Sequence, residues 1–337
     1  MDGAFIKVVS MINYTKPNMD IWTGRIDDDK NYNAFRWHQW VKPLNLMDET
    51  ISLDSNQAGV AFIGFLSDEG VRRNLGRPGA VNGPKSIRKE LCNLPCSFSS
   101  DLKLFDAGDI YCEDNDLETA QKSLSLAVSK IMDMGLFPLV LGGGHEVALG
   151  TYMGIKTKTN LGIINFDAHF DIRPYKNGAS SGTMFRQIAD YCKLNELPFN
   201  YYCIGIQKRG NTVELFNTAD ALGIEYLLAK DIEEGALEDA FASLDDFIEK
   251  QESIYVTICS DVFSSAFAPG VSAVQPLGLH PSRVLKFFDR IFTHKKVIAM
   301  DIAEVSPRYD QDNITSNLAA TFIFAAVNSI ASNNIKL

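Results

Sequence analysis

The chain alternates between short apolar runs and longer segments whose apolar residues recur at helical spacing. Apolar runs bounded by glycine, proline or charged residues are typical of strands that are buried on both faces of a sheet. Eight runs of this kind predict strands at 59–65, 102–110, 137–141, 161–166, 199–207, 224–229, 253–258 and 297–305. Helical spacing predicts helices at 84–91, 115–135, 147–155, 184–192, 232–250, 282–293 and 316–332.

Strands that alternate with helices are joined by right-handed crossovers and lie parallel in one sheet. We therefore expect an α/β protein with three layers, helix–sheet–helix, built on a doubly wound parallel sheet of about eight strands. The residues before the first predicted strand are polar, with Trp22, Trp37 and Trp40 interspersed. We predict that residues 1–58 form an arm packed on a main domain of residues 59–337.

Composition and charge exclude several classes of partner. Of the 337 residues, 46% are apolar and 22% are charged, so the chain can bury a sizeable core. The net charge of −10 and the pI of about 5.0 argue against a nucleic-acid or anionic-membrane partner, because both need a basic face. We expect no apolar run of the roughly 18 residues that span a bilayer, and no signal peptide. Six scattered cysteines favour a reducing, cytoplasmic location.

Candidate chemistry stands at the end of the predicted strand 161–166. Asp167, His169 and Asp171 follow that strand, each two residues from the next. In an extended chain alternate side chains lie on one face, so two carboxylates and an imidazole point the same way. Carboxylate oxygen and imidazole nitrogen together suit hard and borderline divalent metals. The alternation favours a metal site over a solvated loop that contains a histidine by chance.

Other predicted strands end in residues of the same kind. His145, Cys259, Asp261 and Glu304 each lie at or just after the end of such a strand. Ligands of open parallel sheets bind beyond the carboxyl ends of the strands, so we expect these side chains to converge. The glycine turn before His145 does not match GxGxxG, which argues against a dinucleotide site.

Several motifs resemble those of the ureohydrolase family, which includes arginases, agmatinases and formimidoylglutamases. The resemblance covers the chain from residue 22 onward and rests on WTGRID, GVRRNLGRPGAVNGP, LGGGHE, IINFDAHFDIR, SSGTMF, FAPGVSA and DIAEVSP. WTGR, SSGT-x-F and APGVSA are most similar to the formimidoylglutamase members. The resemblance implies an arginase-like three-layer α/β/α fold, two Mn²⁺ ions at the strand ends and assembly as a homo-oligomer.

The family pattern implies a role for each candidate ligand. His145 and Asp171 would bind the first manganese ion, and His169 would bind the second. Asp167 would bridge the two ions, and Asp261 would belong to the second.

The chain departs from the family at one ligand. The family has a bridging Asp two residues before the position of Asp261, and this chain has Cys259 there. A thiolate carries the same charge as a carboxylate, but soft sulfur favours zinc or iron over manganese. Two interpretations follow: a second metal site that is weakened, altered in preference or sensitive to oxidation, or an inert buried cysteine beside ligands that bind without it.

The resemblance also implies the reaction. It is hydrolysis of the C–N bond of N-formimidoyl-L-glutamate, in histidine degradation, to L-glutamate and formamide, by attack of metal-bound hydroxide on the amidine carbon. Asp261 would hold and relay the proton of the nucleophile, and Glu304 would pair with the cationic amidinium. Ureohydrolases that act on guanidinium groups often have a His where this chain has Phe185, which favours formimidoylglutamate over arginine.

The substrate carries two carboxylates that need cationic partners. Arg173, two residues after Asp171, is the first candidate, because a guanidinium binds a carboxylate through two parallel hydrogen bonds. Weaker candidates are the cations of two loops: Arg73, Arg77, Lys208 and Arg209.

Two alternatives to formimidoylglutamate hydrolysis stay open. The first is another amidine or guanidine hydrolase of the same fold, such as an agmatinase or guanidinobutyrase. The second is a relative whose catalysis is impaired because Cys259 replaces the bridging Asp. A panel of amidine and guanidine substrates separates the first alternative from formimidoylglutamate hydrolysis. Bound metal without hydrolysis would indicate the second.

Overall fold

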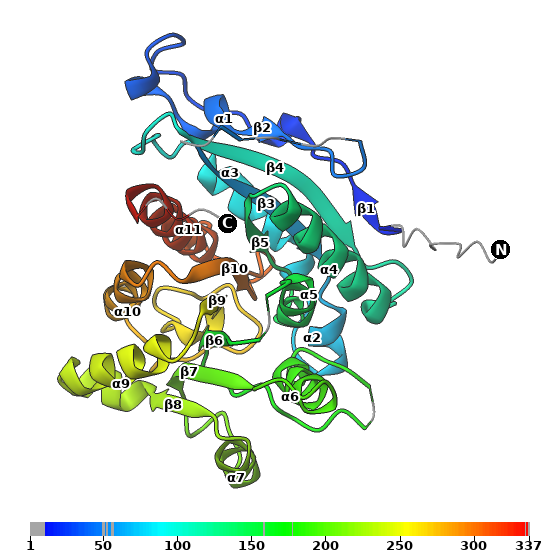
Figure 1. Ribbon diagram of the computed structural model, residues 1–337, viewed down its shortest axis with the longest axis vertical. Coiled ribbons are helices and arrows are strands. Elements are labelled where there is room, and N and C mark those ends of the chain that lie inside the picture. Colours follow the sequence, from blue (N-terminus) through cyan, green and yellow to red (C-terminus); the bar gives the residue numbers. More distant parts are fainter. Residues whose placement is uncertain are drawn as a thin grey trace.

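A mostly parallel sheet forms the centre of the computed structural model, which describes residues 11–48, 51, 53–54, 57–157, 159–176, 178–333 and 335. Within these residues the sheet has 10 strands, in the order β1-β4-β3-β5-β10-β9-β6-β7-β8, with β2 paired to β4 (Figure 1). The strands are β1 (Tyr14–Thr15), β2 (Lys42–Pro43), β3 (Ala58–Leu66), β4 (Leu102–Tyr111), β5 (Phe137–Leu141), β6 (Leu161–Phe166), β7 (Asn200–Ile206), β8 (Glu225–Leu228), β9 (Ser253–Cys259) and β10 (Val297–Ala303). All eight predicted strands are present as β3 to β10, and they lie parallel.

Helices cover both faces of this sheet, which confirms the three-layer prediction (Figure 1). The helices are α1 (Trp37–Trp40), α2 (Glu69–Arg73), α3 (Gly83–Leu91), α4 (Leu117–Asp133), α5 (Val147–Gly154), α6 (Met184–Leu194), α7 (Val213–Ala221), α8 (Ala229–Glu234), α9 (Glu238–Glu249), α10 (Pro281–Thr293) and α11 (Ile314–Asn333), with single 3-10 turns at Met19–Ile21, Tyr32–Ala34, Ala80–Asn82 and Ser260–Val262. Side chains of β3 alternate between two cores: Val60 and Phe62 pack with α3 and α11, and Ala61 packs with α4.

The helices differ from the prediction at 232–250, and α1, α2 and α7 were not predicted. The segment 232–250, expected as one helix, is divided into α8 and α9 at Gly235, whose N–H donates to the Asp231 carbonyl as α8 ends. The five-residue helix α2 lies in a glycine- and arginine-rich stretch that looks like a loop. Its periodicity is too short to detect, and ion pairs of Glu69 with Arg72 and Arg73 support it.

The N-terminal segment packs along the edge of the sheet (Figure 1). β1 pairs antiparallel with β4, and β2 pairs parallel with it. Trp22 is buried, and its Nε1–H donates to Asp106 Oδ2 at 2.6 Å. The same Asp106 oxygen lies 2.9 Å from Nε of Arg88, which is also buried. The hydrogen bond from Trp22 to this buried ion pair therefore attaches the arm to the main sheet.

The last helix corrects one expectation. α11 is long and apolar enough to cross a membrane by length and composition, so the prediction that no apolar run reaches this length is wrong. Half of its most apolar window (50%) is buried inside the protein, where α11 packs against α3 and α10. A helix that covers a sheet and two neighbouring helices needs this composition without a bilayer.

Candidate metal centre and substrate cavity

Four neighbouring strands at the middle of the sheet, β5, β10, β9 and β6, carry the predicted ligands at their carboxyl ends. His145 follows β5 and Asp167 begins the loop after β6. Cys259 ends β9, and Glu304 follows β10. Because these strands are parallel neighbours, residues far apart in sequence meet at one edge, where open α/β sheets bind ligands.

The first group of donors surrounds His145. Its Nδ1 lies 2.9 Å from Asp167 Oδ2 and 3.1 Å from Asp171 Oδ2. An imidazole nitrogen carries at most one N–H, so Nδ1 cannot donate a full hydrogen bond to two carboxylate oxygens at once. A cation between the three atoms would satisfy all of them. The Cys259 thiol joins this group, with ligand atoms of His145, Asp167 and Cys259 all within 4.8 Å of one another.

The second group surrounds His169. Its Nδ1 lies 3.4 Å from Asp167 Oδ1 and 3.2 Å from Asp261 Oδ2. Among the described residues, no hydrogen-bond donor reaches the buried Asp261 Oδ1. Asp167, fully buried, directs one oxygen toward each imidazole. The donors therefore fall into two sets that share Asp167.

The two groups shift one another's pKa values. Burial lowers the pKa of His145 and His169, but the neighbouring carboxylates raise it by a larger amount, so both pKa values stand well above 6.5. Against the effect of burial, the same bonds hold the pKa of Asp167 below its usual range. Burial and the charge of Asp167 raise the pKa of Asp171 to about 6. The carboxylates thus require positive charge beside them, which divalent cations supply.

A buried network lies behind His145, and the sequence analysis missed it. His145 Nε2 lies 3.0 Å from Thr257 Oγ1, and that hydroxyl donates to Asp301 Oδ1 at 2.6 Å. The Tyr255 hydroxyl donates to the other Asp301 oxygen. Because Thr257 donates to Asp301, it accepts from His145 Nε2–H, which leaves Nδ1 to face the carboxylates. The signals were a carboxylate inside an apolar strand and two polar residues, Tyr255 and Thr257, on the Cys259 face of β9.

The backbone is strained at two site residues. Asp171 has a φ of 51° and Glu304 a φ of 65°, in the left-handed region that side chains with a Cβ rarely adopt. Glu304 is buried, and its Oε1 accepts from the backbone N–H of His145 at 3.0 Å. The glycine turn before His145 also packs closely on the end of β3: a Cβ at Gly143 would lie 1.7 Å from the Ser67 carbonyl oxygen.

A cavity of about 330 Å³, the central cavity, opens onto the donor groups. Its lining includes the predicted residues His145, His169, Asp171, Arg173, Cys259, Asp261 and Glu304, together with Asn74, Leu75, Arg77, Ser181 and Ser272. Asp167 lies beneath its floor. Phe185 does not line it; this buried ring packs edge-to-face against His145 at 5.7 Å and stacks on Tyr201.

The candidate cations have different surroundings. Arg173 is exposed at the central cavity, and no carboxylate of the described residues pairs with its guanidinium. Arg77 also lines the cavity, but its Nε and Nη2 donate to the Ser272 and Val271 carbonyls. Lys208 and Arg209 line a separate cavity of about 800 Å³, so the structure does not bring Lys208 to the metal ligands.

Comparison with known proteins places this geometry in a family. Residues 58–328 match the model of the arginase family. The chain belongs to the arginase family. It is 56% identical over 328 residues to a formimidoylglutamase of Clostridium tetani, covering 95% of this chain and 97% of that one. It is 44% identical over 318 residues to a formimidoylglutamase of Geobacillus thermodenitrificans, covering 93% and 97%.

A solved arginase-family structure gives the same result. A single-residue variant of the Trypanosoma cruzi formiminoglutamase, solved with Mn²⁺, superposes with a TM-score of 0.71 and 26% identity, covering 86% of this chain and 98% of that one. The arginase-like α/β fold predicted from the sequence is therefore confirmed. Of the named site residues, the structure gathers the candidate metal ligands, Glu304, Arg77 and Arg173 at the central cavity or in contact with its lining, whereas Arg73, Lys208 and Arg209 do not line it.

Proposed function

We propose that this arginase-family chain is a formimidoylglutamase, which hydrolyses N-formimidoyl-L-glutamate to L-glutamate and formamide. The observation that carries the proposal is the 56% identity to a formimidoylglutamase across 95% of the chain. The wall of the central cavity supports it, because the guanidinium of Arg173, which no described carboxylate pairs with, lines the same cavity as the candidate metal ligands. An amidine with carboxylates needs both features at once.

We infer that the two donor groups hold two divalent cations, with manganese as the family's ion. His145 and Asp171 would hold the first, His169 and Asp261 the second, and Asp167 would contact both. The paired donors around each imidazole and the unpartnered Asp261 oxygen fit such ions. When bound, the cations supply Lewis acidity that makes a water molecule nucleophilic at neutral pH.

Cys259 stands where the family pattern has a carboxylate, and we propose that it lowers the preference of the site for manganese. Burial, followed by the charges of Asp167 and Asp261, raises the pKa of the Cys259 thiol well above 9.0. Metal binding by this sulfur therefore releases a proton. Thiolate sulfur favours zinc or iron, whereas manganese prefers oxygen.

Three side chains would act on the substrate. Glu304 would accept hydrogen bonds from the amidinium and orient its carbon, since burial and the charges of Glu146 and Asp261 already raise the Glu304 pKa and favour a cationic partner. Asp261, which lines the central cavity, would take the proton of the nucleophile. Arg173 would bind one substrate carboxylate through two parallel hydrogen bonds.

The experiment that tests this function is a substrate panel. The chain is loaded separately with Mn²⁺, Zn²⁺ and Fe²⁺ under reducing conditions, and product release is measured with formimidoylglutamate, arginine, agmatine and guanidinobutyrate. Formamide release from formimidoylglutamate alone supports the proposal. Faster hydrolysis of a guanidine would identify another ureohydrolase, and retained metal without any hydrolysis would identify an impaired relative, the outcome that Cys259 makes worth testing.

Two broader predictions accompany this function. We propose a homo-oligomer, which the family resemblance implies, and sedimentation of the loaded chain would measure it. We also propose a cytoplasmic location, because the six cysteines are scattered along the sequence and suit a reducing compartment.

A further inference from the structure

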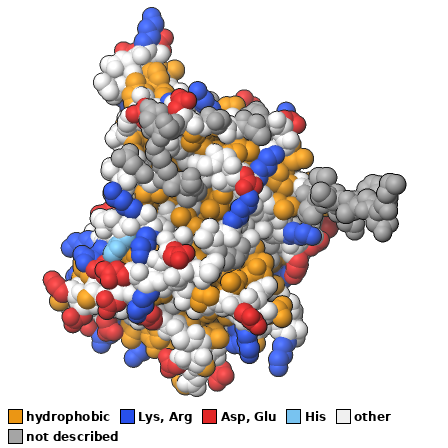
Figure 2. Space-filling model, viewed as in Figure 1, with side chains coloured by type: hydrophobic (Ala, Val, Ile, Leu, Met, Phe, Trp, Pro, Cys, Tyr) orange, Lys and Arg blue, Asp and Glu red, His pale blue; other side chains and the backbone are white. Residues whose placement is uncertain are grey.

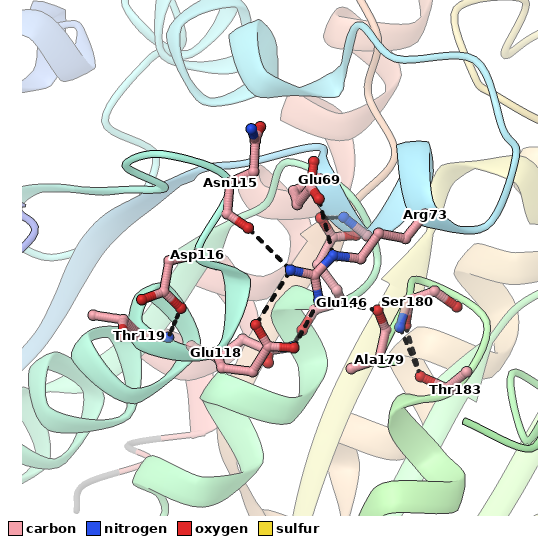
Figure 3. Close-up of polar contacts among 12 residues, drawn as sticks. Glu69, Arg73, Asn115, Asp116, Glu118, Thr119, Glu146, Ala179, Ser180 and Thr183 are labelled. Carbon is pink, nitrogen blue, oxygen red and sulfur yellow. Dashed lines mark hydrogen bonds and ion pairs between the residues drawn. The ribbon is translucent and has the colours of Figure 1, made fainter. Parts of the chain in front are cut away.

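Arg73, the last residue of α2, lies behind the wall of the central cavity and not on its lining. A guanidinium has five N–H donors, and this one uses all of them (Figure 3). Nε donates to Glu69 Oε1 at 2.9 Å, and the two terminal nitrogens donate to both Glu118 oxygens at 2.6 and 3.2 Å. The remaining two bonds reach the carbonyls of Ala179 and Asn115, at 3.3 and 2.9 Å.

These bonds join three segments that are distant in sequence (Figure 3). Glu69 belongs to α2, and Glu118 belongs to the first turn of α4. Ala179 belongs to the loop 178–183, which precedes α6. The side chain of Arg73 is 24% exposed and that of Glu118 is 58% exposed, so solvent screens part of this pair, and its strength rests on the two-oxygen geometry and on the other three bonds of Arg73.

The loop 178–183 places groups that face the substrate. Ser181 lines the central cavity. The Gly182 carbonyl accepts from the backbone N–H of Arg173 at 2.9 Å. The two residues also touch, since a Cβ at Gly182 would lie 3.1 Å from Arg173 Cδ. A shift of this loop would therefore move both Ser181 and Arg173.

The other side of α2 is attached to the metal ligands. The Gly70 N–H donates to Glu146 Oε1 at 2.8 Å, and Glu146 directly follows the ligand His145. The Gly70 carbonyl accepts from the Ser181 N–H at 3.1 Å. The first turn of α2 thus contacts the His145 segment on one side and the loop 178–183 on the other.

We propose that Arg73 is a positioning residue for substrate binding: by fixing the loop 178–183 to α2 and α4, it sets the distance between the metal ligands and Arg173. This inference rests on the proposed function, in which Arg173 binds a substrate carboxylate. The sequence offered Arg73 as a weaker candidate for a substrate carboxylate; its five bonds leave no donor for one.

The test compares Arg73→Gln with Arg72→Gln in the full, metal-loaded chain. Arg72 is a matched control, because it lies on the same helix and binds the same Glu69, but it is 59% exposed and contacts neither Glu118 nor Ala179. We expect Arg73→Gln to raise KM for formimidoylglutamate about tenfold, with kcat and bound metal within about twofold of the wild type. Arg72→Gln should leave KM unchanged.

Amide hydrogen exchange gives a readout that does not depend on substrate. Peptides covering the loop 178–183 should exchange faster in Arg73→Gln, and also in Arg73→Lys, because three ammonium donors cannot make five bonds. Wild-type exchange or wild-type KM in Arg73→Gln would overturn the inference, as would full restoration by Arg73→Lys or an equal effect of Arg72→Gln.

Further measurements distinguish failure of the proposed function from failure of the Arg73 inference. If the wild-type chain releases no formamide, the proposed function fails and the substrate part of this inference fails with it. If the wild type is active but Arg173→Gln leaves KM unchanged, the role assigned to Arg173 fails, and the proposed consequence of moving the loop is overturned. Unchanged exchange in Arg73→Gln overturns the Arg73 inference alone.

Discussion

Replacing Thr257 by Val tests how the protein holds His145, the first proposed metal ligand. Val is close to Thr in shape but lacks the hydroxyl that accepts from His145 Nε2 at 3.0 Å and donates to Asp301 Oδ1 at 2.6 Å. All three side chains are buried, so water cannot replace the lost bonds. Thr257→Ser is the matched control, because it keeps the hydroxyl and removes only the methyl group.

The expected size follows from the two groups that lose a partner. A buried polar group left without a hydrogen bond costs about 1–3 kcal/mol, so the His145 N–H and the Asp301 oxygen together cost about 2–6 kcal/mol of unfolding free energy. With an unfolding entropy of roughly 2.1 cal/mol/K per residue, or about 0.7 kcal/mol/K for 337 residues, Tm falls by about 3–9 °C. Metal affinity should fall by about 10–100-fold, because the ring that presents Nδ1 is no longer oriented.

Two measurements check this prediction. Thermal unfolding is followed in the presence of chelator, and metal affinity is measured by titration against a competing chelator at fixed pH. Thr257→Ser should stay within about 1 kcal/mol of the wild type and bind metal with near-native affinity. Equal behaviour of the Val and Ser variants in both assays would refute the role given to the hydroxyl.

Three further predictions concern the metal ligands and the arm. Cys259→Asp should bind manganese roughly tenfold or more tightly, by metal analysis and turnover, since oxygen replaces sulfur; if neither changes, the cysteine is inert. The raised pKa values of His145 and His169 imply ion pairs that stabilise the chelator-treated chain fully below pH 6.5 and are lost as pH rises through the raised values, so its Tm should fall with rising pH. Metal affinity should rise over the same range, because the imidazoles lose their protons; an affinity that falls would contradict this. Trp22→Phe removes the 2.6 Å bond to Asp106 and should cost about 1.5–3 kcal/mol with metal content unchanged; an unaltered Tm would show that the arm is held otherwise.

The charged side chains on the surface agree with the acidic composition and do not indicate a further partner. Figure 2 shows acidic and basic side chains interspersed over one face, with no broad basic area on it. This suits the prediction that nucleic acid is not a partner, which stays a prediction.

The sheet could be read from the chain because strand periodicity is local. Near-continuous apolar runs identified β3 to β10, and the spacing of Asp167, His169 and Asp171 placed three side chains at the end of β6. The helix α2 was missed, because five residues give too little periodicity, and its stability comes from ion pairs.

The sequence alone determined which side chains are candidate metal ligands and the edge of the sheet at which they lie, because both follow from local patterns and the parallel topology they imply. Only the tertiary structure decided which basic side chains are available to a substrate. Arg73 and Arg173 are both candidate substrate cations in the sequence, but the donors of Arg73 are used by Glu118, 45 residues away, and by three other residues, whereas Arg173 lines the central cavity. The Thr257–Asp301 network likewise depends on two strands that meet only in the folded sheet. Partners of a buried charge are set by long-range packing, which spacing along the chain does not record.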